Sequence, residues 1–290
     1  MENKDNWDIA RLISWITSYF KEKKLDNPRL AAELILCDIL GKDRVYLYTN
    51  FDQPLSEEEL AELRKNVKRR ASYEPVAYII GERSFFEFDF KVNKDVLIPR
   101  PDTEILLESA LKYLREKSSP FVLDLGTGSG ILAVSIAASI SDSKVIASDI
   151  SYPSLKIARQ NAFLFASDRN ISFLLSSWFD SIKQSCKFDL IVSNPPYIKS
   201  CAIKELQPEV RMYEPMHALD GGDDGLDAYK SILSSVAFYL KDDGLLMMEI
   251  GFDQAGDLEK LCSESNSLEL LEILKDYGGR DRVVIIRKNS

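Results

Sequence analysis

The residues with the clearest chemical potential form a short run, Asn194-Pro195-Pro196-Tyr197. The run follows residues 188–192, an apolar segment that is typical of a buried strand. Neither proline can donate a hydrogen bond to a sheet, so the chain must leave the sheet there as a stiff loop. Open α/β sheets bind their ligands at the carboxyl ends of their strands, which is where this loop is predicted to lie.

The residue types in this loop suit the binding of a planar NH2 group. The side-chain carbonyl of Asn194 and a backbone carbonyl of the prolines can accept its two hydrogens, and Tyr197 offers a flat face. When both hydrogens of the NH2 group are held by acceptors, the nitrogen lone pair is directed to one side. A weak nitrogen nucleophile needs this orientation before it attacks a methyl group. A plain strand-ending turn is the alternative, because Asn-Pro is a common turn signal.

A glycine-rich loop follows another predicted strand at residues 121–125. Its members are Gly126, Thr127, Gly128, Ser129 and Gly130. Such a loop lets the backbone approach a ligand closely, and it could cradle the pyrophosphate of a dinucleotide. The spacing here is GxGxG, and Asp124 would repel a pyrophosphate. A carboxylate at that place suits a cationic ligand such as S-adenosylmethionine better.

Two further residues stand at the ends of predicted strands. Asp149 ends the strand at 144–148, where an acid could accept hydrogen bonds from ribose hydroxyls, or could simply serve the start of the next helix. Trp178 follows the strand at 171–175, where its ring could pack against an adenine or belong to the core.

The elements that must position these residues alternate from residue 120 onward. Strands at 121–125, 144–148, 171–175, 188–192 and 244–250 are separated by helices at 131–140, 153–166 and 226–240. A helix at 254–262 and a strand pair at 268–275 and 282–287 complete a doubly wound sheet. Asp102 or Thr103 is expected to cap a helix that runs to about residue 114.

The first 73 residues have a different pattern. Apolar spacing predicts three or four helices, with Pro28 opening the second and Ser56 capping the third. A β-hairpin is predicted between the two parts, with its strands near 76–81 and 84–92. We therefore expect a helical N-terminal substrate-recognition domain at 1–73, a linking hairpin at 74–99 and a catalytic domain at 100–290.

Composition limits the function classes. The 290 residues carry a net charge of -9, which disfavours a broad footprint for a nucleic-acid backbone. The four cysteines form no CxxC pair, so neither a zinc site nor a disulfide framework is expected. His217 is the only histidine and is assigned a structural role. Residues 1–5 lack the cationic start of a signal peptide, no apolar run is long enough for a bilayer, and the scattered thiols fit a reducing cytosol, so we expect a cytoplasmic protein. We also expect a monomer.

Further motifs make the chain resemble a known enzyme family. They are Ile-Pro-Arg-Pro-Asp-Thr-Glu at 98–104, Val-Arg-Met-Tyr-Glu-Pro at 210–215, Gly-Gly-Asp-Asp-Gly-Leu at 221–226 and Asp-Tyr-Gly-Gly-Arg-Asp-Arg-Val-Val at 276–284. With the glycine loop, Asp149 and the Asn-Pro-Pro-Tyr loop, they resemble signatures of the release factor glutamine methyltransferases. The resemblance covers essentially the whole chain and implies a Rossmann-like class I methyltransferase domain that binds S-adenosylmethionine.

The resemblance also implies residue roles. Residues 126–130 and Asp149 would bind the cofactor, with Trp178 beside the adenine. Asn194 would sit between cofactor and substrate, and residues 194–197 would hold the glutamine of a Gly-Gly-Gln loop in peptide chain release factors, whose amide N5 is methylated. Many family members have Asp before this tryptophan, where the chain has Ser177, which weakens any contact from that position to the adenine amine.

Three other functions compete with this one. An adenine-N6 methyltransferase acting on DNA or RNA shares the Asn-Pro-Pro-Tyr loop, but it usually adds a target-recognition region and a basic surface. A non-catalytic scaffold could lose the loop residues freely, and a dinucleotide oxidoreductase conflicts with Asp124 and the glycine spacing. The roles of Arg100, Glu104 and Glu249 stay open, because salt bridges or caps explain them equally well.

Overall fold

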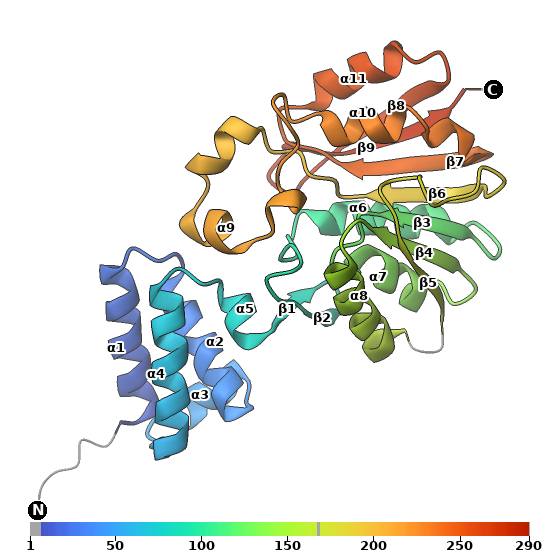
Figure 1. The fold of residues 1–290 in the computed structure, drawn as a ribbon. Coiled ribbons are helices and arrows are strands. Elements are labelled where there is room, and N and C mark those ends of the chain that lie inside the picture. The colour runs from blue at the N-terminus through green and yellow to red at the C-terminus, as the bar shows by residue number, and fades with distance from the viewer. Residues whose placement is uncertain (1–6, 167–168, 290) are drawn as a thin grey trace, which may run out of the picture. The chain divides into compact units, whose positions relative to one another are not determined.

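The computed structural model describes residues 7–166 and 169–289, and it divides the chain into two compact units (Figure 1). The first unit holds the chain up to Gly81 together with Gln207–Tyr213, and the second holds Glu82–Leu206 and Glu214–Ser290. Residues 1–6, which begin the predicted helical domain and carry the expectation about a signal peptide, lie outside the described residues. In the described part of the chain, none of the helices has the length and hydrophobicity that crossing a bilayer requires.

The first unit is helical, as the apolar spacing predicts. Its helices are α1 (Ile9–Glu22), α2 (Pro28–Leu40), α3 (Arg44–Thr49), α4 (Glu57–Ala71), α5 (Val76–Ile80) and α9 (Pro208–Tyr213). Pro28 occupies the first turn of α2, and Ser56 and Glu59 form the predicted capping box of α4. The distant α9 joins this unit through an ion pair between Arg70 of α4 and Glu209.

The predicted hairpin exists, but its position was wrong. Residues 76–80 form α5 and not a strand, because Pro75 starts a helical turn there and Gly81 ends it with a φ of 80°. Both hairpin strands, β1 (Glu82–Phe85) and β2 (Phe88–Lys91), lie within the run that was predicted as one strand. The hairpin packs on α8 (Tyr152–Phe165) of the second unit, where the rings of Phe88 and Phe165 have centroids 4.9 Å apart.

The second unit is built on a seven-stranded sheet in the order β5-β4-β3-β6-β7-β9-β8. The strands are β3 (Phe121–Leu125), β4 (Lys144–Asp149), β5 (Asn170–Leu175), β6 (Phe188–Ser193), β7 (Leu240–Glu249), β8 (Leu268–Lys275) and β9 (Asp281–Lys288). The first five are parallel neighbours, whereas β9 runs antiparallel to both β7 and β8. This is the predicted doubly wound, Rossmann-like fold with a final antiparallel pair.

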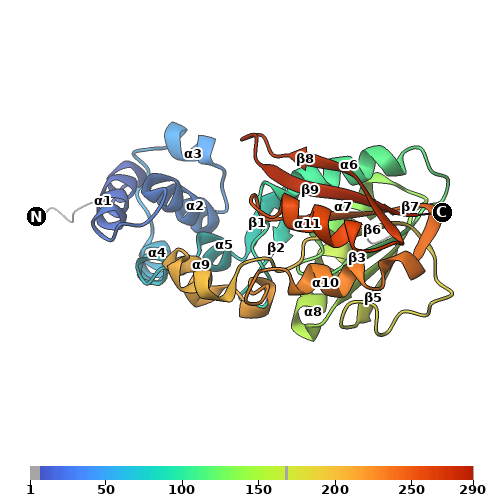
Figure 2. The same cartoon turned by 90° about the horizontal axis from the view of Figure 1, so that it is seen from above.

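Helices cover both faces of the sheet. One apolar cluster joins a sheet face to α6 (Thr103–Leu114), α7 (Ile131–Ser139) and α8 (Tyr152–Phe165), and another joins the opposite face to α10 (Asp227–Leu233) and α11 (Ala255–Ser263). Figure 2 shows the same sheet and helices from above. The helix predicted at 226–240 ends early, at Leu233, and a 3-10 turn (Val236–Phe238) leads into β7. Two more 3-10 turns, Ser200–Glu205 and Met216–Ala218, lie between β6 and α10.

The direction of successive strands sets the place for a ligand. From β3 the chain moves outward to β4 and β5, then returns to the other side of β3 with β6 and β7. The crevice above the carboxyl ends of β3 and β6 is therefore the topological switch point, where folds of this kind bind ligands. The glycine loop follows β3 and the Asn-Pro-Pro-Tyr loop follows β6, so the two predicted site segments flank this crevice.

Candidate functional site

A cavity of about 240 Å³ opens at the carboxyl ends of the parallel strands, within the second unit. Its wall contains the glycine loop, the ends of β4, β5 and β6, and a segment that precedes α6. The lining residues include Arg100, Thr103, Asp124, Gly126, Thr127, Gly128, Ser129, Asp149, Ser176, Ser177, Trp178, Asn194, Pro195, Pro196 and His217. Every predicted site residue except Gly130 and Tyr197 is among them.

The glycine loop has the backbone shape that its sequence predicts. Gly126, Gly128 and Gly130 have φ angles of 72°, 56° and 86°, which side chains with a Cβ rarely adopt. The backbone N–H groups of Gly126 and Thr127 both donate to the carbonyl of Ser148 on β4, at 2.9 Å. A Cβ at Gly130 would come within 3.1 Å of Ala158, so this glycine serves helix packing and not the cavity surface.

Asp124 is buried beneath this loop. Its Oδ2 accepts hydrogen bonds from the Thr127 hydroxyl at 2.6 Å and from the Ala133 N–H at 3.1 Å. Its Oδ1 is buried and has no hydrogen-bond partner, and the residue lines the cavity. Burial raises the pKa of this carboxyl to about 7. An unpaired carboxylate oxygen in a cavity wall fits a ligand with positive charge or N–H donors, and it does not fit a pyrophosphate.

Asp149 connects the end of β4 to the glycine loop. Its Oδ2 accepts from the Gly128 N–H at 2.9 Å, and its Oδ1 accepts from the Ser151 N–H at 2.8 Å, just before α8. Burial raises its pKa, although these two backbone donors oppose the effect. Because each carboxylate oxygen can accept a second hydrogen bond, the residue can hold a diol while it organises the loop. The two alternatives for Asp149 are thus compatible.

The position of Trp178 is compatible with both of its predicted roles. It lines the cavity and packs partly against the apolar cluster on the α10 and α11 side. Its φ of 43° lies in the left-handed region, which is rare for a bulky residue. The hydroxyl of Ser176 donates to the Trp178 carbonyl at 3.0 Å and accepts from the Ser181 N–H at 3.0 Å, so it holds this turn. Strained backbone that is held by its surroundings is typical of ligand-binding sites.

The Asn-Pro-Pro-Tyr loop meets the same cavity from the β6 side. Asn194, Pro195 and Pro196 line the cavity wall. Tyr197 packs against the apolar cluster behind the loop, and its backbone carbonyl accepts from Gln254 Nε2 at 3.1 Å. The structure therefore brings the amide of Asn194 and the proline backbone to the ligand space.

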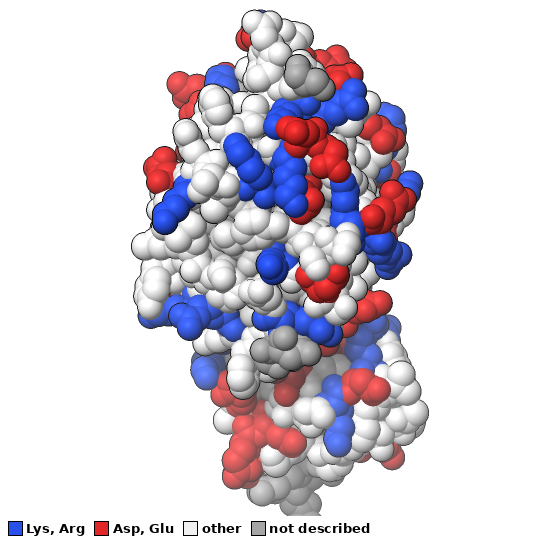
Figure 3. All heavy atoms as spheres, turned by 90° about the vertical axis from the view of Figure 1, so that its right-hand side faces the viewer, with Lys and Arg blue, Asp and Glu red and all other residues white. Residues whose placement is uncertain are grey.

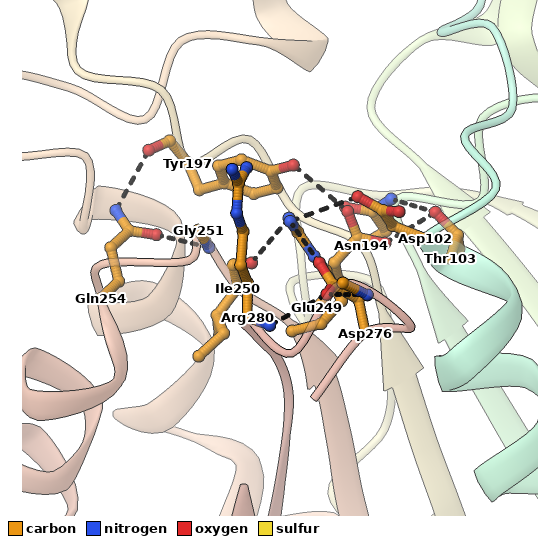
Figure 4. A network of polar contacts seen from close by, with 12 residues as sticks. Asp102, Thr103, Asn194, Tyr197, Glu249, Ile250, Gly251, Gln254, Asp276 and Arg280 are labelled. Carbon is orange, nitrogen blue, oxygen red and sulfur yellow. Dashed lines mark hydrogen bonds and ion pairs between the residues drawn. The ribbon is translucent and has the colours of Figure 1, made fainter. Parts of the chain in front are cut away.

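Sequence reasoning did not find the polar network behind this loop, which Figure 4 shows. Asn194 Nδ2 donates to the hydroxyl of Thr103 at 3.1 Å, and that hydroxyl donates to Glu249 Oε2 at 2.6 Å. Asp102 occupies the N-cap position of α6, as the sequence predicts. The Asp102 side chain makes no capping hydrogen bond, and it pairs with Arg282 at 3.2 Å instead.

The segment before α6 and the only histidine complete the wall. Glu214 accepts from the Ile98 N–H at 3.1 Å and from Arg100 Nη2 at 2.6 Å, so one buried carboxylate secures this segment. Glu104, whose role the sequence left open, accepts from the Phe86 N–H of the hairpin at 3.1 Å. His217 lines the cavity, although the sequence assigned it a structural role.

Between residues 7 and 289, apart from 167 and 168, no cluster of His, Cys, Asp and Glu could hold a metal ion. On the face that Figure 3 presents, acidic and basic side chains are interspersed.

Comparison with known proteins agrees with this site. Residues 11–81 match the PrmC N-terminal domain, and residues 102–209 match the methyltransferase small domain. The release factor glutamine methyltransferase of Geobacter sulfurreducens is 42% identical over 283 residues, which are 98% of each chain. That of Fusobacterium nucleatum is 40% identical over 93% of this chain and 76% of its own.

The fold has solved relatives as well. A methyltransferase from Pyrococcus furiosus superposes with a TM-score of 0.50 at 16% identity, over 80% of this chain and 98% of its own. At that identity the likeness concerns the fold alone. The sequence relatives are far closer and extend over nearly the full chain, so the chain belongs to the release factor glutamine methyltransferases, a family of S-adenosylmethionine-dependent enzymes.

Proposed function

We propose that this enzyme methylates the side-chain amide nitrogen, N5, of the glutamine in the Gly-Gly-Gln motif of peptide chain release factors. One observation carries the proposal: a single cavity is lined both by the glycine loop with Asp149 and by Asn194, Pro195 and Pro196. A cofactor and a small planar substrate group can therefore meet inside it. Relatives with 42% and 40% identity carry the name of this activity.

The residues present fit the cofactor. Asp124 offers an unpaired buried oxygen, which suits the ammonium end of S-adenosylmethionine. Asp149 has acceptor capacity left for the two ribose hydroxyls, and Trp178 offers an aromatic face for the adenine. When bound, the cofactor supplies a methyl group on a positively charged sulfur, a strong electrophile.

The protein's own task is to aim the glutamine amide. The Oδ1 of Asn194 and the backbone carbonyl of Pro195 accept the two hydrogens of the substrate NH2, and Tyr197 supports the loop from behind. This draws the nitrogen lone pair out of conjugation and toward the methyl group. The cofactor, held by Asp124, Asp149 and Trp178, would supply the methyl group to this nitrogen, and the amide proton would then pass to water. No general base is required, so positioning and electrostatic pre-organisation account for catalysis.

Two observations favour a protein substrate over a nucleic acid. The chain has a net charge of -9, and it is covered end to end by relatives that bear a release-factor name. We further propose that the helical N-terminal domain contributes to recognition of the release factor, that the enzyme is a monomer, and that it acts in the cytoplasm, where translation terminates.

Incubation of a release factor with enzyme and S-adenosylmethionine, followed by peptide mass spectrometry, tests the proposal. We expect one added methyl group on the glutamine of the Gly-Gly-Gln peptide, and none when that glutamine is replaced by glutamate in the substrate. Duplex DNA and RNA, offered with labelled cofactor in parallel reactions, should remain unlabelled. Labelled nucleic acid together with an unmodified release factor would overturn the proposal in favour of an adenine methyltransferase.

A further inference from the structure

A buried carboxylate lies behind the Asn-Pro-Pro-Tyr loop and contacts it at both ends. Glu249, the last residue of β7, is 1% exposed. Its Oε1 accepts from the Tyr197 hydroxyl at 3.2 Å, and its Oε2 accepts from the Thr103 hydroxyl at 2.6 Å. Thr103, which is fully buried, then accepts from Asn194 Nδ2 at 3.1 Å (Figure 4). Residues 194 and 197 are thus tied to the same side chain.

The direction of these hydrogen bonds follows from the number of hydrogens. A carboxylate can only accept, and a threonine hydroxyl has a single hydrogen to give. Because Thr103 gives that hydrogen to Glu249, it can only accept from Asn194. The amide of Asn194 must therefore present its NH2 to Thr103, which leaves Oδ1 on the opposite edge of the planar group. Asn194 itself lines the cavity, so the edge that remains for a substrate is the acceptor.

We infer that Glu249 and Thr103 are positioning residues that lock the amide of Asn194 with its oxygen toward the substrate. The inference rests on the proposed function, since an acceptor is needed only if the substrate presents an NH2 group. With the amide turned over, Asn194 would offer two N–H donors to a group that has two hydrogens of its own, and the nitrogen would not be held.

Two neighbours favour the ionised form of Glu249 against the effect of burial. Burial raises the pKa of this carboxyl, whereas the hydrogen bond from Thr103 and the charge of Arg282 on β9 act in the opposite direction. Arg282 is itself buried and is held by Asp102 at 3.2 Å and by Asp276 at 3.3 Å. Burial raises the pKa of the Tyr197 phenol, so this group remains a donor to Glu249. A charged glutamate with two donors is the arrangement that a buried carboxylate requires.

Three substitutions test the lock in the full-length enzyme. Thr103→Val removes the hydroxyl and keeps the shape, whereas Thr103→Ser keeps the hydroxyl. Glu249→Gln keeps the shape of residue 249 but can donate to Thr103, which frees the Thr103 hydrogen to turn the Asn194 amide over. Ser143→Ala is the matched control, because it removes another buried hydroxyl, one that donates to the Ile140 carbonyl at 2.7 Å ahead of β4.

We expect Thr103→Val and Glu249→Gln to lower kcat for release-factor methylation on the order of 10- to 100-fold, as misplacement of a reacting group does. The dissociation constant of S-adenosylmethionine should change by no more than about 2-fold, because neither variant alters Asp124, Asp149 or Trp178. Thr103→Ser should restore kcat to within about 3-fold of wild type, and Ser143→Ala should not reduce it.

The outcomes separate this inference from the function on which it rests. If the wild-type enzyme leaves the glutamine unmodified, the proposed function fails. If the wild type is active and the folded Thr103→Val and Glu249→Gln variants keep its kcat, the lock is wrong and the function stands. If Thr103→Ser loses as much activity as Thr103→Val, the hydroxyl is not the operative group, and the inference is overturned as well.

Discussion

Asp124 provides a prediction in which binding and stability change in opposite directions. We expect Asp124→Asn to stabilise the ligand-free protein and to weaken cofactor binding. The side chain is 1% exposed, and its Oδ1 has no partner. A buried charge without a partner is costly, and the same unpaired oxygen is what a cationic ligand can use.

The magnitude follows from the pKa of this carboxyl. Burial raises that pKa from its ordinary value of 3.8 to about 7. Between these values the native state binds more protons than the unfolded state, so stability falls as pH rises and is constant again above about 7. At about 1.4 kcal/mol per pKa unit, the ionised side chain costs the fold about 4 kcal/mol at pH 8 and about half of that at pH 5.5.

Thermal unfolding of wild type and variant at the two pH values is the assay. Asparagine keeps an acceptor for Thr127 and Ala133 and does not titrate, so its own effect is independent of pH. The advantage of the variant should therefore grow by about 2 kcal/mol from pH 5.5 to pH 8, or about 4 to 8 °C in melting temperature. Asp253→Asn, at an exposed site, controls for the introduction of an amide.

Two results would refute this reasoning. An advantage of equal size at both pH values would mean that Asp124 is not the buried titrating group. A variant that binds S-adenosylmethionine as tightly as wild type, measured by calorimetry at pH 8, would remove Asp124 from the cofactor site.

Two further substitutions test other parts of the account. Asp149→Ala should raise the dissociation constant of S-adenosylmethionine on the order of 10- to 100-fold, because two charge-assisted hydrogen bonds are lost. An unchanged constant by calorimetry would contradict the ribose role. Arg70→Met should destabilise the first unit by about 2 kcal/mol, because Arg70 is 3% exposed and pairs with Glu209. Urea unfolding without a shift in midpoint would show that this ion pair does not hold residues 207–213.

Local patterns in the sequence were sufficient for most of the sheet. Buried strands such as β3 and β6 are short apolar runs that end at a glycine loop and at a proline pair, and both runs were found within about a residue. The segment 76–80 was misread because it is apolar and only five residues long, a length at which helix and strand share one pattern. Its boundaries, Pro75 and Gly81, were the available signal for a helical turn.

The sequence predicted the parts of the site that depend on residues close together in the chain. It did not predict the contacts between residues that are far apart in the chain. The glycine loop, Asp149 and Asn194 each stand at the end of a strand, which places them at one edge of a parallel sheet. The partner of Thr103 is 146 positions away, and that of Arg70 is 139 positions away. The spacing of neighbouring residues cannot predict contacts between residues so far apart in the chain. The available signals for the first pair were a threonine next to the segment that lines the cavity and a glutamate at the end of a strand.

The central claim is that a rigid, acceptor-lined loop aims a glutamine amide at the cofactor. The most direct measurement is single-turnover methylation of a release factor by Asn194→Ala, with cofactor affinity and melting temperature measured on the same preparation. We predict that the methylation rate falls by about 100- to 1,000-fold, the range expected for the loss of one pre-organised hydrogen-bonding group. The melting temperature and the cofactor affinity should stay close to those of the wild type. A folded Asn194→Ala enzyme that methylates the glutamine at the wild-type rate would contradict the account.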